Sequence, residues 1–111
     1  MVDQLSATLQ RLDAVRWRLA FELQAAMAQL RVPPPATAAR RDGLWQHLCG
    51  ELFVAGTDAR YGEYNFAPSG EWAAYVFDGW RRQQSAAQLD VEPTVIVTHQ
   101  SAAALRWQAE F

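Results

Sequence analysis

The sequence contains a single cysteine, Cys49, among its 111 residues. One cysteine excludes an internal disulfide framework and any zinc site built from several thiolates. The few glycines are scattered, so there is neither a glycine-rich phosphate loop nor a Gly-x-Ser-x-Gly elbow. These absences exclude the motif-defined nucleotide-binding and α/β-hydrolase classes.

Positive charge is also scarce, because ten arginines and no lysine stand against twelve acidic residues, for a net charge of -2. Without a basic stripe, we expect neither a nucleic acid nor an anionic membrane as partner. No apolar run approaches the roughly 18 residues of a membrane helix. A secretory signal begins with a basic segment followed by an apolar block, whereas the N-terminus of this chain carries Asp3 and Asp13. We therefore expect a cytoplasmic protein.

Apolar residues are plentiful, at 50% of the chain, and 12% of the residues are aromatic. This is enough for a packed core and excludes global disorder. The length favours one domain over residues 1–111. The many alanines and the use of arginine alone are typical of a high-GC bacterial sequence.

Strict alternation of apolar and polar residues predicts a strand over 15–24. The pattern continues as a possible second strand over 27–32, but no turn residues separate the two, which leaves a helix as the alternative. Residues 1–14 fit either a helix or a strand. Three consecutive prolines then predict a loop over 33–43.

Alternation returns over 44–55, where we expect a strand with Trp45, His47 and Glu51 on one face. The clearest local signal lies in 61–77, where Ala67-Pro68-Ser69-Gly70 has the composition of a type I turn closed by a left-handed glycine. Both flanks are rich in aromatic residues. We therefore predict a hairpin in which four pairs of residues face each other, namely Phe66 and Trp72, Asn65 and Ala73, Tyr64 and Ala74, and Glu63 and Tyr75.

Near the end of the chain, 94–98 reads as a strand and 99–101 as a turn, and apolar residues alternate again from Leu105. The sum is six or seven short strands joined by loops. This pattern predicts an all-β, antiparallel β-sandwich of the jelly-roll or immunoglobulin-like kind.

Six residues form the candidate site if 44–55 and 61–66 are neighbouring strands. An aromatic surface flanked by carboxylate and amide groups suits a sugar, whose CH face stacks on a ring while its hydroxyls are bound from the side. The candidate ligand-binding residues are Trp45, His47, Glu51, Glu63, Asn65 and Tyr75. The alternative is that they form only the half-polar outer face of a sandwich.

Two further functions stay open at this stage. Glu51 and Glu63 could act as a carboxylate pair in a glycosidase-like hydrolase. The same face could also be an interface in a structural or assembly protein. A nucleophilic Cys49 or a metal site built from His47 and His99 has weak support, because neither shows the spacing of such sites.

The segments 42–54 and 61–75 resemble the DOMON-like family of small bacterial proteins and, more distantly, family 9 carbohydrate-binding modules and DOMON domains. They share an acidic residue near a strand start, a Glu-Leu-Phe strand and a Tyr-x-Glu-x-Asn-x-x-Pro-x-Gly hairpin. The resemblance implies a β-sandwich that binds carbohydrate or, in cytochrome-type relatives, haem. Met27, His47 and His99 do not match the haem ligands, so no cofactor is expected. Gly50 departs from the pattern, where a bulky aromatic residue is expected.

Members of that family usually extend further at the C-terminus, so we expect this chain to be a shortened version. Leu105, Trp107 and Phe111 make its last run apolar. An uncovered apolar strand is a template for pairing with another chain. We therefore predict a homodimer in which the C-terminal strands pair or exchange.

Overall fold

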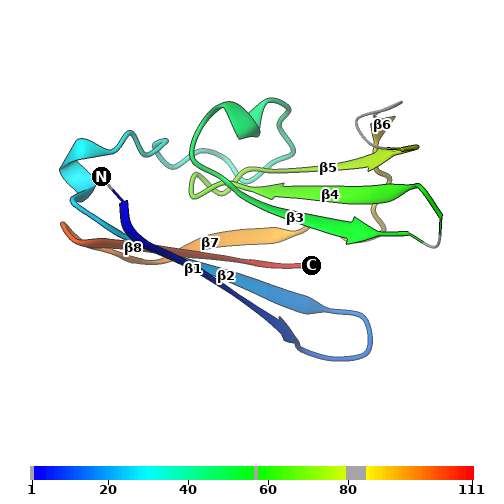
Figure 1. Cartoon of the computed structure of the whole chain (residues 1–111), viewed down its shortest axis with the longest axis horizontal. Helices are drawn as coiled ribbons and strands as arrows, with labels where there is room; N and C mark the ends of the chain where they lie inside the picture. Colours follow the sequence, from blue (N-terminus) through cyan, green and yellow to red (C-terminus); the bar gives the residue numbers. More distant parts are fainter. Residues whose placement is uncertain (1, 57, 80–84) are drawn as a thin grey trace.

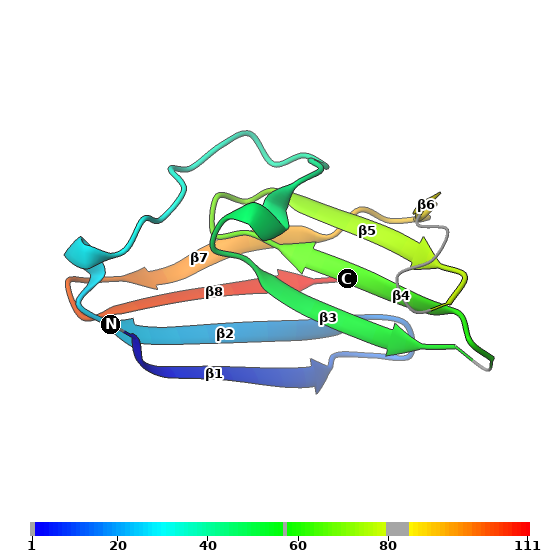
Figure 2. The ribbon, with the colours of Figure 1, turned by 45° about the horizontal axis from the view of Figure 1, so that its top comes forward.

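The computed structural model describes residues 2–56, 58–79 and 85–111. Its strands form two antiparallel four-stranded sheets that pack face to face (Figure 1). The predicted all-β sandwich is confirmed. The first sheet has the order β1-β2-β8-β7 and the second the order β3-β4-β5-β6 (Figure 2).

The described elements are strands of two to ten residues and two short 3-10 helices, which lie between β2 and β3. In chain order they are β1 (Val2–Arg11), β2 (Trp17–Ala25), η1 (Met27–Gln29), η2 (Leu44–Gln46), β3 (Gly50–Ala55), β4 (Tyr61–Phe66), β5 (Trp72–Phe77), β6 (Ser85–Ala86), β7 (Thr94–Gln100) and β8 (Ala104–Glu110).

The strand predicted over 15–24 is β2, and its alternation places Leu19, Phe21 and Leu23 in the core. The preceding segment, which the sequence left open, is the strand β1, and it pairs with β2 from Val2 to Arg11 with one irregularity between Val2 and Gln4. The turn between them is closed by Asp13, whose Oδ1 accepts hydrogen bonds from the backbone N–H groups of Val15 and Arg16 at 2.9 and 2.8 Å.

Two predicted strand segments are wrong. Instead of a strand over 27–32, the chain forms η1, because both edges of β2 are already occupied by β1 and β8. Instead of a strand from residue 44, the chain forms η2, and β3 begins only at Gly50. Gly43 starts η2 in the left-handed conformation, with φ 81°, and this turns Leu44 into a buried position.

The predicted hairpin is confirmed in both register and turn. Phe66 faces Trp72, and Glu63 faces Tyr75 across β4 and β5. Gly70 has a φ of 97°, and its N–H donates to the carbonyl of Ala67 at 3.0 Å. The period of two sends Phe66 and Trp72 into the core and Tyr75 to the opposite face, as predicted.

The C-terminal run forms β7 and β8, but the turn lies later than predicted, because His99 and Gln100 belong to β7. β8 is an interior strand, paired with β2 on one side and β7 on the other. Both of its edges are therefore occupied within one chain. The predicted dimer through these strands stays a prediction, but its premise of an uncovered C-terminal strand does not hold.

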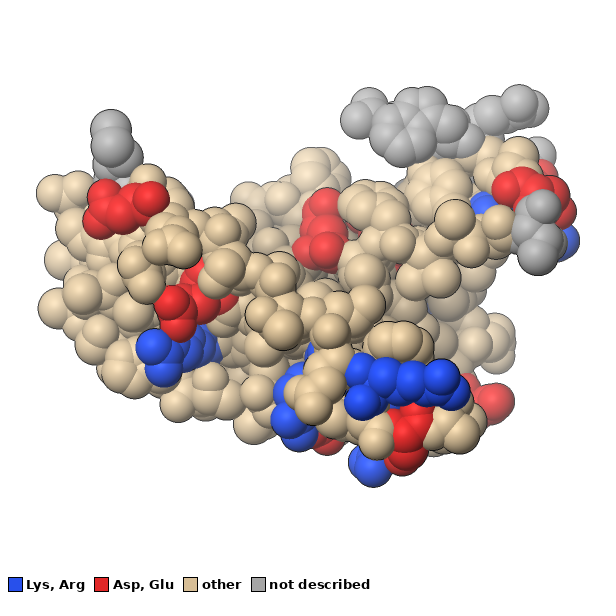
Figure 3. All heavy atoms as spheres, turned by 60° about the horizontal axis from the view of Figure 1, so that its bottom comes forward, with Lys and Arg blue, Asp and Glu red and all other residues tan. Residues whose placement is uncertain are grey.

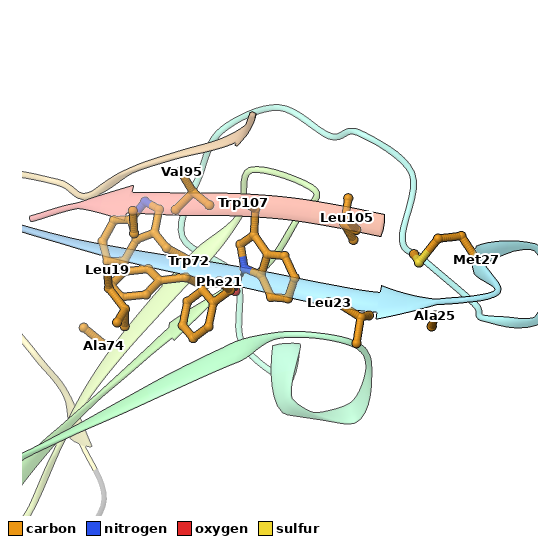
Figure 4. Packing of buried hydrophobic residues seen from close by; sticks show 12 residues of the cluster. Leu19, Phe21, Leu23, Ala25, Met27, Trp72, Ala74, Val95, Leu105 and Trp107 are labelled. Carbon is orange, nitrogen blue, oxygen red and sulfur yellow. Dashed lines mark hydrogen bonds between the residues drawn. The ribbon is translucent and has the colours of Figure 1, made fainter. Parts of the chain in front are cut away.

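The main core lies between the sheets (Figure 4). The rings of Phe21 and Trp107 stack with centroids 5.0 Å apart. The Trp107 indole N–H crosses to the other sheet and donates to the carbonyl of Phe66 at 3.1 Å. This bond satisfies the only polar atom of the Trp107 side chain, which is otherwise buried in apolar surroundings.

Candidate functional site

The outer face of the second sheet, which points away from the first sheet, carries four of the six predicted site residues. Across β3, β4 and β5, Glu51 faces Asn65, and Phe53, Glu63 and Tyr75 form the next row. Residues paired directly across strands project from the same side of a sheet. The neighbouring strands that the site required are therefore present.

The other two predicted residues do not lie on a strand. Trp45 belongs to η2, and its side chain is exposed, with 62% of its surface accessible. It lines a shallow concavity of about 330 Å³ together with Asp42, Gly43, Tyr75, Ser85 and Ala86. His47 lines a different concavity, whose other lining residues include Arg41 and Glu71. The structure thus joins Trp45 to Tyr75 but separates His47 from both.

Tyr75 is held in place by a hydrogen bond that the sequence analysis did not identify. Its hydroxyl donates to Oδ1 of Asp42 at 2.7 Å. Burial, together with this bond and the charge of Asp42, raises the pKa of Tyr75 to about 12. The hydroxyl therefore stays protonated at neutral pH. The one signal for Asp42 in the sequence was its match to the acidic residue of the DOMON-like pattern.

Asn65 has no exposed surface, and both polar atoms of its side-chain amide lack a hydrogen-bond partner within the described residues. It is therefore enclosed by the protein rather than presented to a ligand. The sequence marked it as a polar group on an outward face. The alternation of apolar and polar residues predicts the face of the sheet on which a side chain lies, but it does not predict whether another segment covers that face.

A second, smaller apolar cluster explains this burial. Leu44 of η2 packs on the outer face of the sheet, against Ala67, Ala73, Tyr75 and Phe77. The loop before β3 therefore covers part of a surface that the pattern alone assigns to solvent, as Figure 2 shows for η2 over β3 and β4. The open part of the face lies toward Phe53, whose ring is 53% exposed.

The carboxylates on this face act on neighbouring titratable groups. Burial raises the pKa of Glu63, and the nearby charge of Glu51 raises it further. Burial and both carboxylates raise the pKa of the Cys49 thiol to about 11. Cys49 therefore stays a neutral thiol at physiological pH, which is the wrong state for a nucleophile.

The largest described cavity lies elsewhere, at the end where the two sheets diverge. It has a volume of about 680 Å³ and is lined largely by apolar side chains, among them Trp17, Val54, Val76, Leu89 and Phe111. The charged residues at its rim, Asp58 and Arg60, pair with each other at 3.1 Å. Glu63 is a third charged residue in the lining, so the cleft is mainly apolar but not free of charge.

Comparison with protein-family models, curated proteins and solved structures found no match for this chain. The resemblance to the DOMON-like family therefore stays a prediction. No helix in the described part of the chain is long and apolar enough to cross a membrane.

Proposed function

We propose that this chain is a non-catalytic, ligand-binding β-sandwich, and that its ligand is a carbohydrate bound between Trp45 and Tyr75. The observation that supports this most directly is the exposed Trp45 indole, which shares one concavity with the hydrogen-bonded pair of Tyr75 and Asp42. The exposed indole is a flat apolar surface on which a ligand can stack.

The chemistry of the concavity fits a sugar. The indole of Trp45 offers a flat apolar surface for the CH face of a pyranose ring. Asp42 uses Oδ1 to accept the bond from Tyr75, and its second carboxylate oxygen has no partner within the described residues. That oxygen is able to accept a bond from a sugar hydroxyl. Because Tyr75 orients Asp42 in advance, the acceptor is ordered before binding.

A binding experiment with matched variants tests this proposal. Glycan-array screening of the purified chain, followed by calorimetric titration, should identify a saccharide that binds without turnover. Trp45→Ala should weaken that binding roughly tenfold to hundredfold, as expected for removal of a stacking ring. Phe53→Ala is the control. It removes another exposed ring, on β3, and should leave the affinity for the saccharide unchanged. Equal loss in both variants, or no loss in Trp45→Ala, would overturn the assignment.

Glycoside hydrolysis is the second candidate, and the raised pKa of Glu63 beside Glu51 favours it. The two residues are diagonal neighbours on adjacent strands, a relationship that places residues about 7–8 Å apart and their Cβ atoms somewhat closer. That separation suits an acid and a base acting on opposite sides of a sugar. However, the cavity whose lining includes Glu63 does not include Glu51, and the groove beside β1 that includes Glu51 does not include Glu63.

Turnover separates the two candidates. If the chain is a hydrolase, the wild type should release reducing sugar from the bound glycan, and Glu63→Gln should abolish that release while binding persists. If it is a binding module, no product forms with either protein. Trp45→Ala then lowers affinity alone.

A further inference from the structure

β1 is an edge strand of the first sheet, and its outer edge is not paired with any described strand (Figure 2). Every residue of β1 is exposed. This includes Leu5 and Leu9, which are 62% and 49% exposed. Their partners on β2 are the core residues Leu23 and Leu19, so both leucines lie on the core-facing side of the sheet. The second sheet does not extend far enough to cover them.

Edge strands in soluble proteins usually carry a proline, an irregularity or an inward charge that prevents pairing with another chain. From Gln4 to Gln10, β1 has no proline and no charged residue, and its register with β2 is continuous. β1 has an irregularity only at its start, between Val2 and Gln4, whereas β7, at the opposite edge of the same sheet, is interrupted in its middle, between Val97 and His99. The stretch from Gln4 to Gln10 is therefore a regular, uncharged edge that is open to pairing.

The sequence of β1 is self-complementary around Ala7. Reading outward from Ala7 in the two directions, Ser6 matches Thr8, Leu5 matches Leu9, Gln4 matches Gln10, and the acidic Asp3 matches the basic Arg11. A strand paired antiparallel with its own copy places each residue opposite its match when Ala7 faces Ala7. We propose that β1 is the interface of a homodimer built in this register.

Geometry restricts the choice of register. A two-fold axis perpendicular to the sheet keeps the core-facing sides of both copies on the same side, so residues that face each other must share a face. The next allowed register in one direction places Leu5 opposite Ala7, and in the other direction it places Leu5 opposite Arg11. The register centred on Ala7 pairs leucine with leucine and produces one continuous eight-stranded sheet. It also brings Asp3, which lies at the irregularity between Val2 and Gln4, to the same end as the partner's Arg11.

The charges at the two ends of β1 suit this pairing. Asp3 forms no ion pair within the described residues. Arg11 also forms no ion pair with a carboxylate of the described residues. Its guanidinium donates to the carbonyls of Asp13 and Ala14 and lies over the Trp17 ring, which holds the charge at the end of the strand. Seen from the side of β1 and β2, most of the surface is uncharged and the basic side chains gather mainly toward one end (Figure 3).

Cross-linking tests the register directly. Residues that face each other in an antiparallel pair have Cα atoms about 4.5 or 5.5 Å apart, and both separations suit a disulfide. In a Cys49→Ser background, Ala7→Cys should therefore oxidise to a covalent dimer. Thr8→Cys, one residue along and equally exposed, faces Ser6 and should remain largely monomeric on a denaturing gel. Equal cross-linking of both variants, or of neither, would refute the register.

Sedimentation over a range of concentrations tests the dimer itself. The wild type should associate reversibly, and Leu5→Lys should raise the dissociation constant at least about tenfold, because the symmetry repeats each lost contact. Ile96→Lys makes the same kind of change, from an exposed apolar residue to lysine, on β7, and it should leave the dissociation constant unchanged. Asp3→Arg should weaken association, and Asp3→Arg combined with Arg11→Asp should restore it. Circular dichroism should verify that each variant is folded. A wild type that stays monomeric at every concentration would overturn the proposal.

Discussion

The ring of Phe21 on β2 occupies the space above Gly50 on β3 where a side chain would otherwise lie. A Cβ atom built on Gly50 would overlap three carbon atoms of that ring. In sequence, Gly50 departs from the aromatic residue expected in the DOMON-like pattern and suggests a weakly packed strand. In the structure, the glycine is the position at which the two sheets approach each other, and Phe21 supplies the missing bulk from the opposite sheet.

The contact between Phe21 and Gly50 predicts a coupled pair of substitutions. Gly50→Ala should lower the free energy of unfolding by about 1–3 kcal/mol, because the ring must move out of a packed core. Combining it with Phe21→Leu should cost less than the sum of the two single changes. Urea unfolding of all four proteins measures the coupling. Additive losses would show that the ring and the glycine do not compete for space.

The turn of the hairpin predicts a position-specific cost at Gly70. Gly70→Val should lower the free energy of unfolding by about 1–2 kcal/mol, because a β-branched residue is strained at a φ of 97°. Gly70→Asn should cost less, since asparagine tolerates the left-handed region. Gly62→Ala serves as the control, because an added Cβ there meets only an ordinary contact with the Tyr75 carbonyl. Thermal unfolding should rank the three variants in that order.

Replacing the buried amide of Asn65 by an apolar side chain should stabilise the fold. Its amide is buried and has no hydrogen-bond partner among the residues that the structure describes, and such a group costs about 1–3 kcal/mol. Asn65→Leu, which keeps the size of the side chain, should therefore raise the free energy of unfolding. Asn65→Asp should lower it sharply, since it places a charge at the same position. If Asn65→Leu proves strongly destabilising in urea, the amide has a partner that offsets its burial.

Tyr75 predicts a loss of stability at alkaline pH. Its pKa in the folded chain, about 12, lies above its ordinary value of 10.0. The neutral hydroxyl therefore contributes stability that is fully present below pH 10 and is lost as the pH rises toward 12. Tyr75→Phe should flatten this decline. The measurement is the free energy of unfolding in urea as a function of pH, and a variant as pH-sensitive as the wild type would exclude Tyr75 as the cause.

Local sequence determines those parts of the fold that form between residues close together in the chain. The alternation along β2 and the turn residues before Gly70 act within a few positions of each other, so strand, face and register were all predictable. The shared face of Glu51 and Glu63 followed from the same period of two.

Tertiary structure decided what depends on distant segments. Residues 44–49 alternate like a strand, yet they turn over the sheet because Leu44 gains burial against Tyr75. The same packing encloses Asn65, and it brings Trp45 to Asp42 while leaving His47 apart. β8 is interior because β2 and β7 both pair with it, although nothing in its own sequence distinguishes an edge from a centre. Burial depends on which surfaces meet across the fold, and alternation encodes only the direction in which each side chain points.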